Sequence, residues 1–100
     1  MLKENKSLKN EIVSFKLGSG EEIIAKVKEH NDDTFELNKA VVLAMAPDGG
    51  MRLIPWLMST NNDDILLNKT NVLGYALTSS DIADQYTQSV SSIQLSLIHI

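Results

Sequence analysis

The feature that most constrains this chain is the alternation of apolar and polar residues on both sides of a glycine-rich turn. Residues 13–17 and 23–27 each carry an apolar side chain at every second position, and Gly18-Ser19-Gly20 lies between them. A period of two over successive segments predicts two half-buried antiparallel strands. Gly18 and Gly20 are expected to supply the positive φ that a tight hairpin requires. The segment therefore predicts the start of a curled antiparallel meander.

The strand pattern continues to about residue 78. Further strands are predicted at residues 34–45, 51–58 and 72–77, and strand character resumes at residues 65–67 after a polar loop or break. Pro55 cannot donate a ladder hydrogen bond, which predicts a bend, a bulge or a sheet edge at that point. Trp56 is interpreted as a packing residue, and the apolar cluster around it predicts a covering partner such as a neighbouring subunit. The fold class that follows is mainly β: a small, strongly bent, five-stranded antiparallel open barrel over residues 12–78.

Both ends of the chain are expected to leave the barrel. Residues 1–11 are lysine-rich and polar, and a short N-terminal helical segment is expected there. Residues 79–94 carry apolar side chains at spacings of three and four, which predicts a C-terminal amphipathic helix. Residues 95–100 read Leu-Ser-Leu-Ile-His-Ile and resemble the peptide translated from the end of a widely used laboratory transposon. They are expected to be a non-native read-through tail.

Composition narrows the class of protein. The chain has 100 residues, 43% of them hydrophobic, which indicates one small domain with a core. It has no cysteine, so disulfides and cysteine-based zinc sites are excluded. No apolar run approaches the roughly 20 residues of a membrane-spanning helix, so a cytoplasmic protein without membrane contact is expected. The formal net charge of −4 argues against broad, non-specific affinity for nucleic acid.

Few residues suggest catalysis. The two histidines are His30, interpreted as a solvated turn residue, and His99, which lies in the expected tail. The acidic pairs Asp32-Asp33 and Asp63-Asp64 lack the spacing of a calcium loop. Gly18-x-Gly20 lacks the third glycine and the following helix of a dinucleotide-binding loop. The sequence therefore predicts no enzyme, no metal site and no cofactor.

Two motifs occur in a fixed order along the chain. The first opens with Phe15-Lys16-Leu17-Gly18-Ser19-Gly20 and ends with Phe35-Glu36-Leu37-Asn38-Lys39-Ala40, and the second is Ile65-Leu66-Leu67-Asn68-Lys69-Thr70-Asn71-Val72. These motifs resemble those of Sm-like proteins, the family that contains eukaryotic Sm and Lsm proteins and bacterial Hfq. Ala25-Lys26-Val27 and His30-Asn31 stand where the family usually has Gly-x-Leu and a hydrophobic–Asp pair. The similarity covers about residues 12–78 and is that of a divergent bacterial or phage-type member.

The resemblance implies a barrel behind an N-terminal helix, assembled into a homo-oligomeric ring of about five to seven subunits. In that family the fourth strand of one subunit pairs with the fifth strand of the next, which removes exposed sheet edges. The implied function is to bind short single-stranded uridine- or adenine-rich RNA at the inner rim, as an RNA chaperone or regulator. The RNA-binding positions carried over lie in two turns: Asn31, Asp32, Asp33 and Thr34 in the first, and Asn68, Lys69 and Thr70 in the second.

The candidate rim departs from the family pattern in its stacking residue. Asp32, Asp33 and Thr34 replace the stacking side chain and the asparagine of the first turn, and only Lys69 matches the Tyr-Lys-His of the Hfq type. A base sandwich needs a flat or cationic partner on each side, and no aromatic partner is evident in the sequence. Two aspartates per subunit also repel phosphate. The alternative is a structural or protein-interaction ring that has kept the fold and lost RNA binding.

Overall fold

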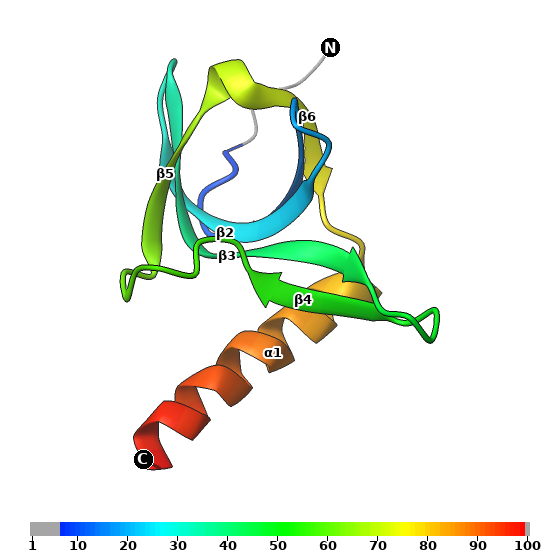
Figure 1. The fold of residues 1–100 in the computed structure, drawn as a ribbon. Helices are drawn as coiled ribbons and strands as arrows, with labels where there is room; N and C mark the ends of the chain where they lie inside the picture. Colours follow the sequence, from blue (N-terminus) through cyan, green and yellow to red (C-terminus); the bar gives the residue numbers. More distant parts are fainter. Residues whose placement is uncertain (1–6, 100) are drawn as a thin grey trace.

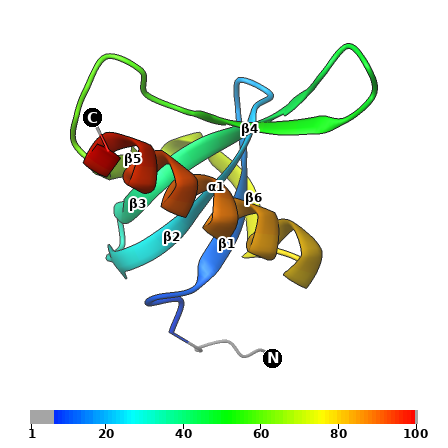
Figure 2. The same cartoon turned by 90° about the horizontal axis from the view of Figure 1, so that it is seen from below.

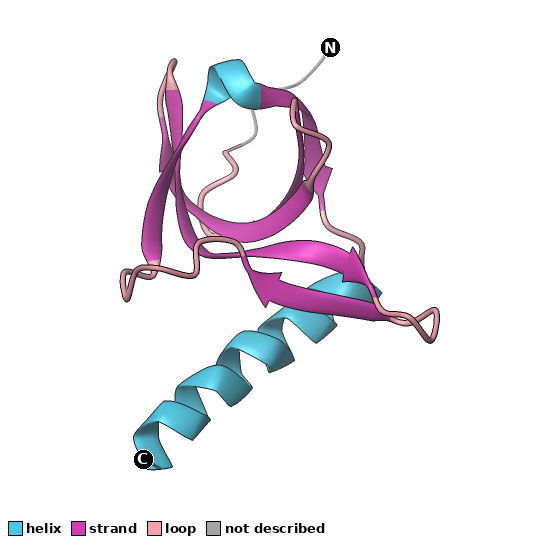
Figure 3. Ribbon diagram, in the orientation of Figure 1, coloured by secondary structure: helices cyan, strands magenta, loops and turns pink. Residues whose placement is uncertain are grey.

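The computed structural model describes residues 7–99, and side chains through Ser91. It contains six antiparallel strands and one C-terminal helix, so the mainly β class is confirmed (Figures 1 and 3). The elements are β1 (Ile12–Leu17), β2 (Glu22–His30), β3 (Thr34–Met45), β4 (Met51–Pro55), β5 (Asp64–Asn68), the short 3₁₀ turn η1 (Lys69–Asn71), β6 (Val72–Leu77) and α1 (Ser80–His99).

The expected N-terminal helical segment is not found in the described residues. Residues 7–11 form a turn in which the Glu11 N–H donates to the Leu8 carbonyl at 2.9 Å. Asn10 lies in the left-handed region with φ of 69°, a conformation that asparagine tolerates better than most residues. Its N–H donates to the Val27 carbonyl at 2.7 Å, so the turn is tied to β2. The rest of that prediction, residues 1–6, lies outside the described residues.

The strands form one curled sheet with the order β4-β3-β2-β1-β6, and β5 pairs with β3 beside β4. The first half of β3 pairs with β5, from Thr34 opposite Asn68 to Asn38 opposite Asp64. Its second half pairs with β4 between residues 41–45 and 51–55. The expectation of five strands, with one running over residues 51–58, is therefore wrong. The strand ends at Pro55, which cannot donate a ladder hydrogen bond, and pairing with β3 resumes only at β5.

The change of partner along β3 takes place at Lys39, which has φ of 55°. This left-handed conformation is costly for a residue with a side chain and persists only where its surroundings hold it. Here the Lys39 N–H donates to the Asp63 carbonyl at 2.7 Å, and the Tyr86 hydroxyl is 2.9 Å from the Asn38 carbonyl and 3.0 Å from the Lys39 carbonyl. The Trp56 N–H donates to the Ala40 carbonyl at 3.0 Å. The backbone groups at the bend are thus satisfied by the loop after β4 and by α1.

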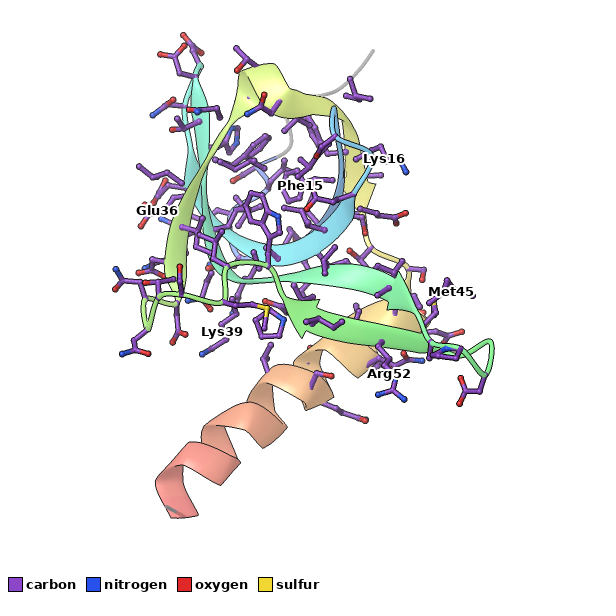
Figure 4. All side chains as sticks on the ribbon, viewed as in Figure 1. Phe15, Lys16, Glu36, Lys39, Met45 and Arg52 are labelled. Carbon is purple, nitrogen blue, oxygen red and sulfur yellow. The ribbon has the colours of Figure 1, made fainter. Side chains whose placement is uncertain are left out.

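The inner face of the curled sheet holds the main core. Phe15 and Phe35 are fully buried and pack edge to face, with ring centroids 5.0 Å apart. Figure 4 shows Phe15 inside the curl, with Lys16 and Glu36 pointing outward. Trp56 packs against this core and its Nε1–H donates to Glu21 Oε2 at 3.1 Å, which confirms its interpretation as a packing residue. The other buried members are Val13, Leu17, Ile23, Ala25, Val27, Leu37, Ala40 and Leu67.

Helix α1 covers part of the outer face, where it runs across the middle strands (Figure 2). Ile24 of β2 and Val41 of β3 are buried there with Tyr86 of the helix, and Ile82 and Val90 pack around them. These helical positions recur at spacings of four, so the expected C-terminal amphipathic helix is present. It begins at Ser80 and extends to His99, beyond the predicted end at residue 94.

The β1–β2 hairpin turn uses one of its two glycines as predicted. Gly20 has φ of 103°, the positive value that the turn requires. The prediction for Gly18 is wrong, because its φ is not positive. Its N–H donates instead to the Asn71 carbonyl at 2.8 Å, and this hydrogen bond ties the hairpin turn to η1.

The sheet curls without closing between β5 and β6. These two strands are joined by η1, and no strand among the described residues pairs with the second edge of either. This opening exposes side chains that face inward. Residues directly opposite each other on paired strands point to the same face of the sheet. Tyr75 and Leu77 lie opposite Phe15 and Val13. Phe15 and Val13 are 0% exposed, whereas Tyr75 is 54% and Leu77 59% exposed.

Candidate functional site

The two turns that carry the predicted site residues meet at one end of the curled sheet. Thr34 at the start of β3 lies opposite Asn68 at the end of β5, and the Lys69 N–H donates to the Asp33 carbonyl at 2.8 Å. Residues 30–34 and 68–71 therefore form one continuous surface, which we call the rim. The structure thus brings together all the residues predicted for the site: Asn31, Asp32, Asp33, Thr34, Asn68, Lys69 and Thr70.

Asn31 organises the first turn. Its Oδ1 accepts from the Asp33 N–H at 2.8 Å, the Thr34 N–H at 2.9 Å and the Thr34 hydroxyl at 3.3 Å. Three donors directed at one atom identify that atom as the carbonyl oxygen and fix the orientation of the amide. This is an Asx turn, in which the side chain imitates a backbone turn. The Nδ2 group makes no hydrogen bond within the described residues, so Asn31 presents only N–H donors to a ligand.

Lys69 supplies the positive charge of the rim, and aromatic rings position it. Its Nζ lies 4.6 Å from the centroid of the Phe35 ring and 3.3 Å from Nδ1 of His30. The imidazole is itself packed at a tilt against Phe35, with centroids 5.5 Å apart. An ammonium over a ring face is attracted by the ring quadrupole. The cation is therefore held in place before any ligand arrives.

The aromatic part of the site was not predicted from the sequence. His30, interpreted as a solvated turn residue, is exposed, but its ring belongs to a cluster with Phe35 and Lys69. Tyr75 of β6 packs edge to face on Phe35 at 5.3 Å and is half exposed at the opening of the sheet. The alternation of β3 predicts that Phe35 is buried. It does not show that β6 and η1 bring a tyrosine and a lysine to the same ring.

The acidic residues of the rim face solvent. Asp32 and Asp33 are exposed, so the rim carries two carboxylates in addition to the Lys69 ammonium. No group of three or more metal-ligating side chains occurs in the described part of the chain. A shallow pocket of about 110 Å³ lies next to the rim. It is lined by Glu29, His30, Asn31, Thr34, Glu36 and Leu66.

The second acidic pair, Asp63 and Asp64, contacts side chains near the bend in β3. Asn38 donates to Asp64 Oδ1 at 2.9 Å and Lys28 donates to Oδ2 at 2.9 Å, and these contacts lower the pKa of the Asp64 carboxyl. The hydrogen bond between Lys28 and Asp64 also raises the pKa of Lys28. Asp63 is paired with the Lys39 ammonium at 2.9 Å. Asp63 and Asp64 therefore hold the loop after β4 against β3.

Charge pairing also occurs on β2 next to the rim. Lys9 and Glu29 form an exposed ion pair at 2.9 Å. Its hydrogen bond raises the pKa of Lys9 and lowers that of Glu29. Exposed pairs of this kind contribute little stability. This pair matters here because it partly neutralises the carboxylate nearest to His30 in sequence.

Comparison with known proteins does not assign the chain to a family. No protein-family model matches it, and no curated protein matches it either. Within the described residues, no helix combines the length and the apolar character needed to cross a membrane.

Proposed function

We propose that this chain is a subunit of an Sm-like ring that binds short single-stranded RNA at the rim, with uridine preferred over adenine. The observation that carries the proposal is the hydrogen bond from the Lys69 N–H to the Asp33 carbonyl, which joins the two turns into one surface. That surface presents a cation and a fixed amide donor side by side. Phosphate requires the first and a base edge requires the second.

The opening between β5 and β6 supports assembly. Within residues 7–99 both strands have an unpaired edge, and Leu66 on β5 and Leu73 on β6 are 69% and 73% exposed, in addition to Tyr75 and Leu77. Unpaired edges with exposed apolar side chains favour pairing with another chain. A strand of one copy beside β6 of the next satisfies the edge and covers Tyr75 and Leu77. Head-to-tail pairing of this type closes into a ring when the rotation between subunits allows it.

The fixed orientation of Asn31 supports a preference for uridine. With Oδ1 engaged by three donors, the side chain offers N–H groups alone. Uracil presents two carbonyl acceptors on either side of one N–H on its Watson–Crick edge, whereas adenine presents a single ring-nitrogen acceptor beside an amino donor. An amino group brought against a donor-only amide leaves both without a partner, which costs affinity.

The test measures subunit mass and RNA affinity on the same preparation. Native mass spectrometry is expected to give a closed oligomer, and a labelled uridine oligonucleotide is expected to bind in low salt, where phosphate contacts are strongest. Lys69→Ala should weaken binding at least about fivefold through loss of a charge-assisted contact. Lys16→Ala is the matched control, because Lys16 is exposed on the outside of the curl (Figure 4). Absence of uridine binding in low salt, or equal losses in both variants, overturns the RNA-binding function.

Asn31→Asp tests the base preference separately. Aspartate keeps the oxygen that accepts from Asp33 and Thr34, so the turn is retained. It replaces the N–H donors by a second carboxylate oxygen, which should abolish the preference for uridine over adenine and weaken binding to both. A variant that keeps the wild-type preference shows that Asn31 does not contact the base.

The exposed carboxylates favour a second candidate, a structural ring without RNA. Asp32 and Asp33 lie beside Lys69 and repel phosphate. This candidate is supported if the closed oligomer forms but no uridine or adenine oligonucleotide binds in low salt.

A further inference from the structure

The contact between Lys69 and His30 fits one form of the imidazole ring. An ammonium has donors and no acceptor, so the contact of 3.3 Å with Nδ1 requires a lone pair on that nitrogen. A neutral imidazole with its proton on Nε2 offers that lone pair, and an imidazolium does not. The position of the Lys69 ammonium over Phe35 therefore belongs to the uncharged form of His30.

Protonation of His30 removes this contact. An imidazolium donates from both nitrogens and accepts from neither. Two positive charges separated by 3.3 Å also repel each other. Lys69 has a flexible four-carbon stem and is the mobile partner, so it is the group that moves away. Histidine is the side chain that ordinarily changes charge between about pH 5 and 8.

Of the charged groups around His30, Lys69 is the one whose position responds to protonation of the imidazole. Glu29 on β2 is engaged by Lys9 at 2.9 Å, and Glu36 on β3 lies 3.9 Å from Lys28. The two lysines partly neutralise these carboxylates. The titratable and charged groups that face or adjoin His30 in the described residues are Glu29 on β2, Asp32 and Asp33 in the turn, Glu36 on β3, and Lys69 on η1.

The geometry points to a pH switch at the rim: protonation of His30 releases Lys69 from Phe35 toward the RNA phosphates. At neutral pH the rim carries one ammonium against the two carboxylates of Asp32 and Asp33, and its ammonium is restrained. In weak acid the imidazolium balances the second carboxylate and the ammonium becomes available. RNA then binds more tightly. This inference rests on the proposed RNA-binding function.

The test compares the affinity for a uridine oligonucleotide at about pH 7.5 and about pH 5.5, at one low salt concentration. Uracil has no group that titrates in this range, so the ligand does not contribute to the difference. We expect the wild-type protein to bind at least about fivefold more tightly at the lower pH. His30→Gln keeps an acceptor for Lys69 and does not titrate, so the ratio of its two dissociation constants should be about one. The same pH ratio in both proteins overturns the switch.

A second measurement separates the switch from RNA binding. At neutral pH the Lys69 methylene signals should be shifted upfield in NMR spectra by the Phe35 ring. On acidification without RNA they should move toward their usual positions in the wild type and stay in place in His30→Gln. If they move as expected but no RNA binds at either pH, the His30 switch is supported and the RNA-binding function is overturned. Lys69 signals that do not respond to pH in the wild type overturn the switch.

Discussion

Phe15 and Tyr75 are opposite each other on neighbouring strands, point to the same face, and differ completely in burial. Phe15 is 0% and Tyr75 54% exposed, although their ring centroids are 6.2 Å apart. The difference is one of position in the sheet. Beyond β1 lies β2, which continues the curl, whereas no described strand lies beyond β6. The two residues thus mark a closed side and an open side of the same sheet.

The contrast separates what the chain needs to fold from what it would offer to a second copy in the proposed ring. The closed side has an apolar interior whose inward side chains are inaccessible to water. The open side presents partly exposed, inward-facing aromatic and aliphatic groups at an edge to which a further strand can pair. One sheet thus carries both a fully packed core and an edge without a partner strand among the described residues. Substitutions on the two sides should therefore differ in how much stability they remove and in whether they affect folding or the proposed assembly.

The largest effect is expected from truncating the closed side. Phe15→Ala should lower the free energy of unfolding by about 3–5 kcal/mol, because it removes a fully buried ring and leaves a cavity. Tyr75→Ala is the matched substitution on the open side and should lower it by about 1 kcal/mol or less. Denaturant unfolding at one protein concentration measures both. Equal losses would show that Tyr75 is buried in solution and that the sheet is closed.

A smaller effect is expected at the bend in β3. Tyr86→Phe should cost about 1–2 kcal/mol, because it leaves the Asn38 and Lys39 carbonyls without their donor. Tyr75→Phe removes a hydroxyl at the exposed open side and should change stability by less than about 0.5 kcal/mol. Thermal unfolding near neutral pH measures the difference. Similar losses in the two variants would mean that the Tyr86 hydroxyl is not needed at the bend.

Tyr86 also predicts an alkaline limit to stability. Burial raises the pKa of Tyr86 to about 12, from its usual value of 10.0. The folded state therefore keeps its proton while the unfolded state loses it, so this contribution to stability is complete below about pH 10 and decreases as the pH rises toward 12. Unfolding measured across this range should show a steeper loss for the wild type than for Tyr86→Phe. Parallel curves would contradict the prediction.

The smallest effect on the subunit, and the largest on assembly, is expected at Leu77. Leu77→Lys should leave subunit stability within about 0.5 kcal/mol, because the side chain is 59% exposed. If the proposed ring forms, this substitution should convert it to single chains, because it places a charge where the added strand would lie. Ala76→Lys is the control on the same strand, since Ala76 lies opposite Ser14 and points to the outer face. Sedimentation that finds both variants still assembled would contradict the proposed ring.

The sequence predicted those parts of the fold that depend on local pattern. The period-two alternation of residues 13–17 and 23–27 corresponds to β1 and β2, and the motif resemblance predicted that the turns around Asn31 and Lys69 belong to one site. The bend at Lys39 was not predictable, because a non-glycine residue with φ of 55° is held there by Asp63 and Tyr86 from distant parts of the chain. The position of the Lys69 ammonium was missed for the same reason, since it depends on the rings of His30 and Phe35 on two other strands.

The pairing of β6 with β1 has a consequence for the order of folding. Strands β1 to β4 form successive hairpins between neighbours in sequence, whereas the β1–β6 ladder joins residues as far apart as Val13 and Leu77, 64 positions along the chain. Closing so long a loop costs entropy before any contact repays it, so we expect β6 to dock after the rate-limiting barrier. Mutations in β6 should then speed unfolding and leave the refolding rate nearly unchanged, as stopped-flow kinetics would show. We therefore expect the edge used in the proposed assembly to form last, so that a half-folded chain cannot pair with a second copy through it.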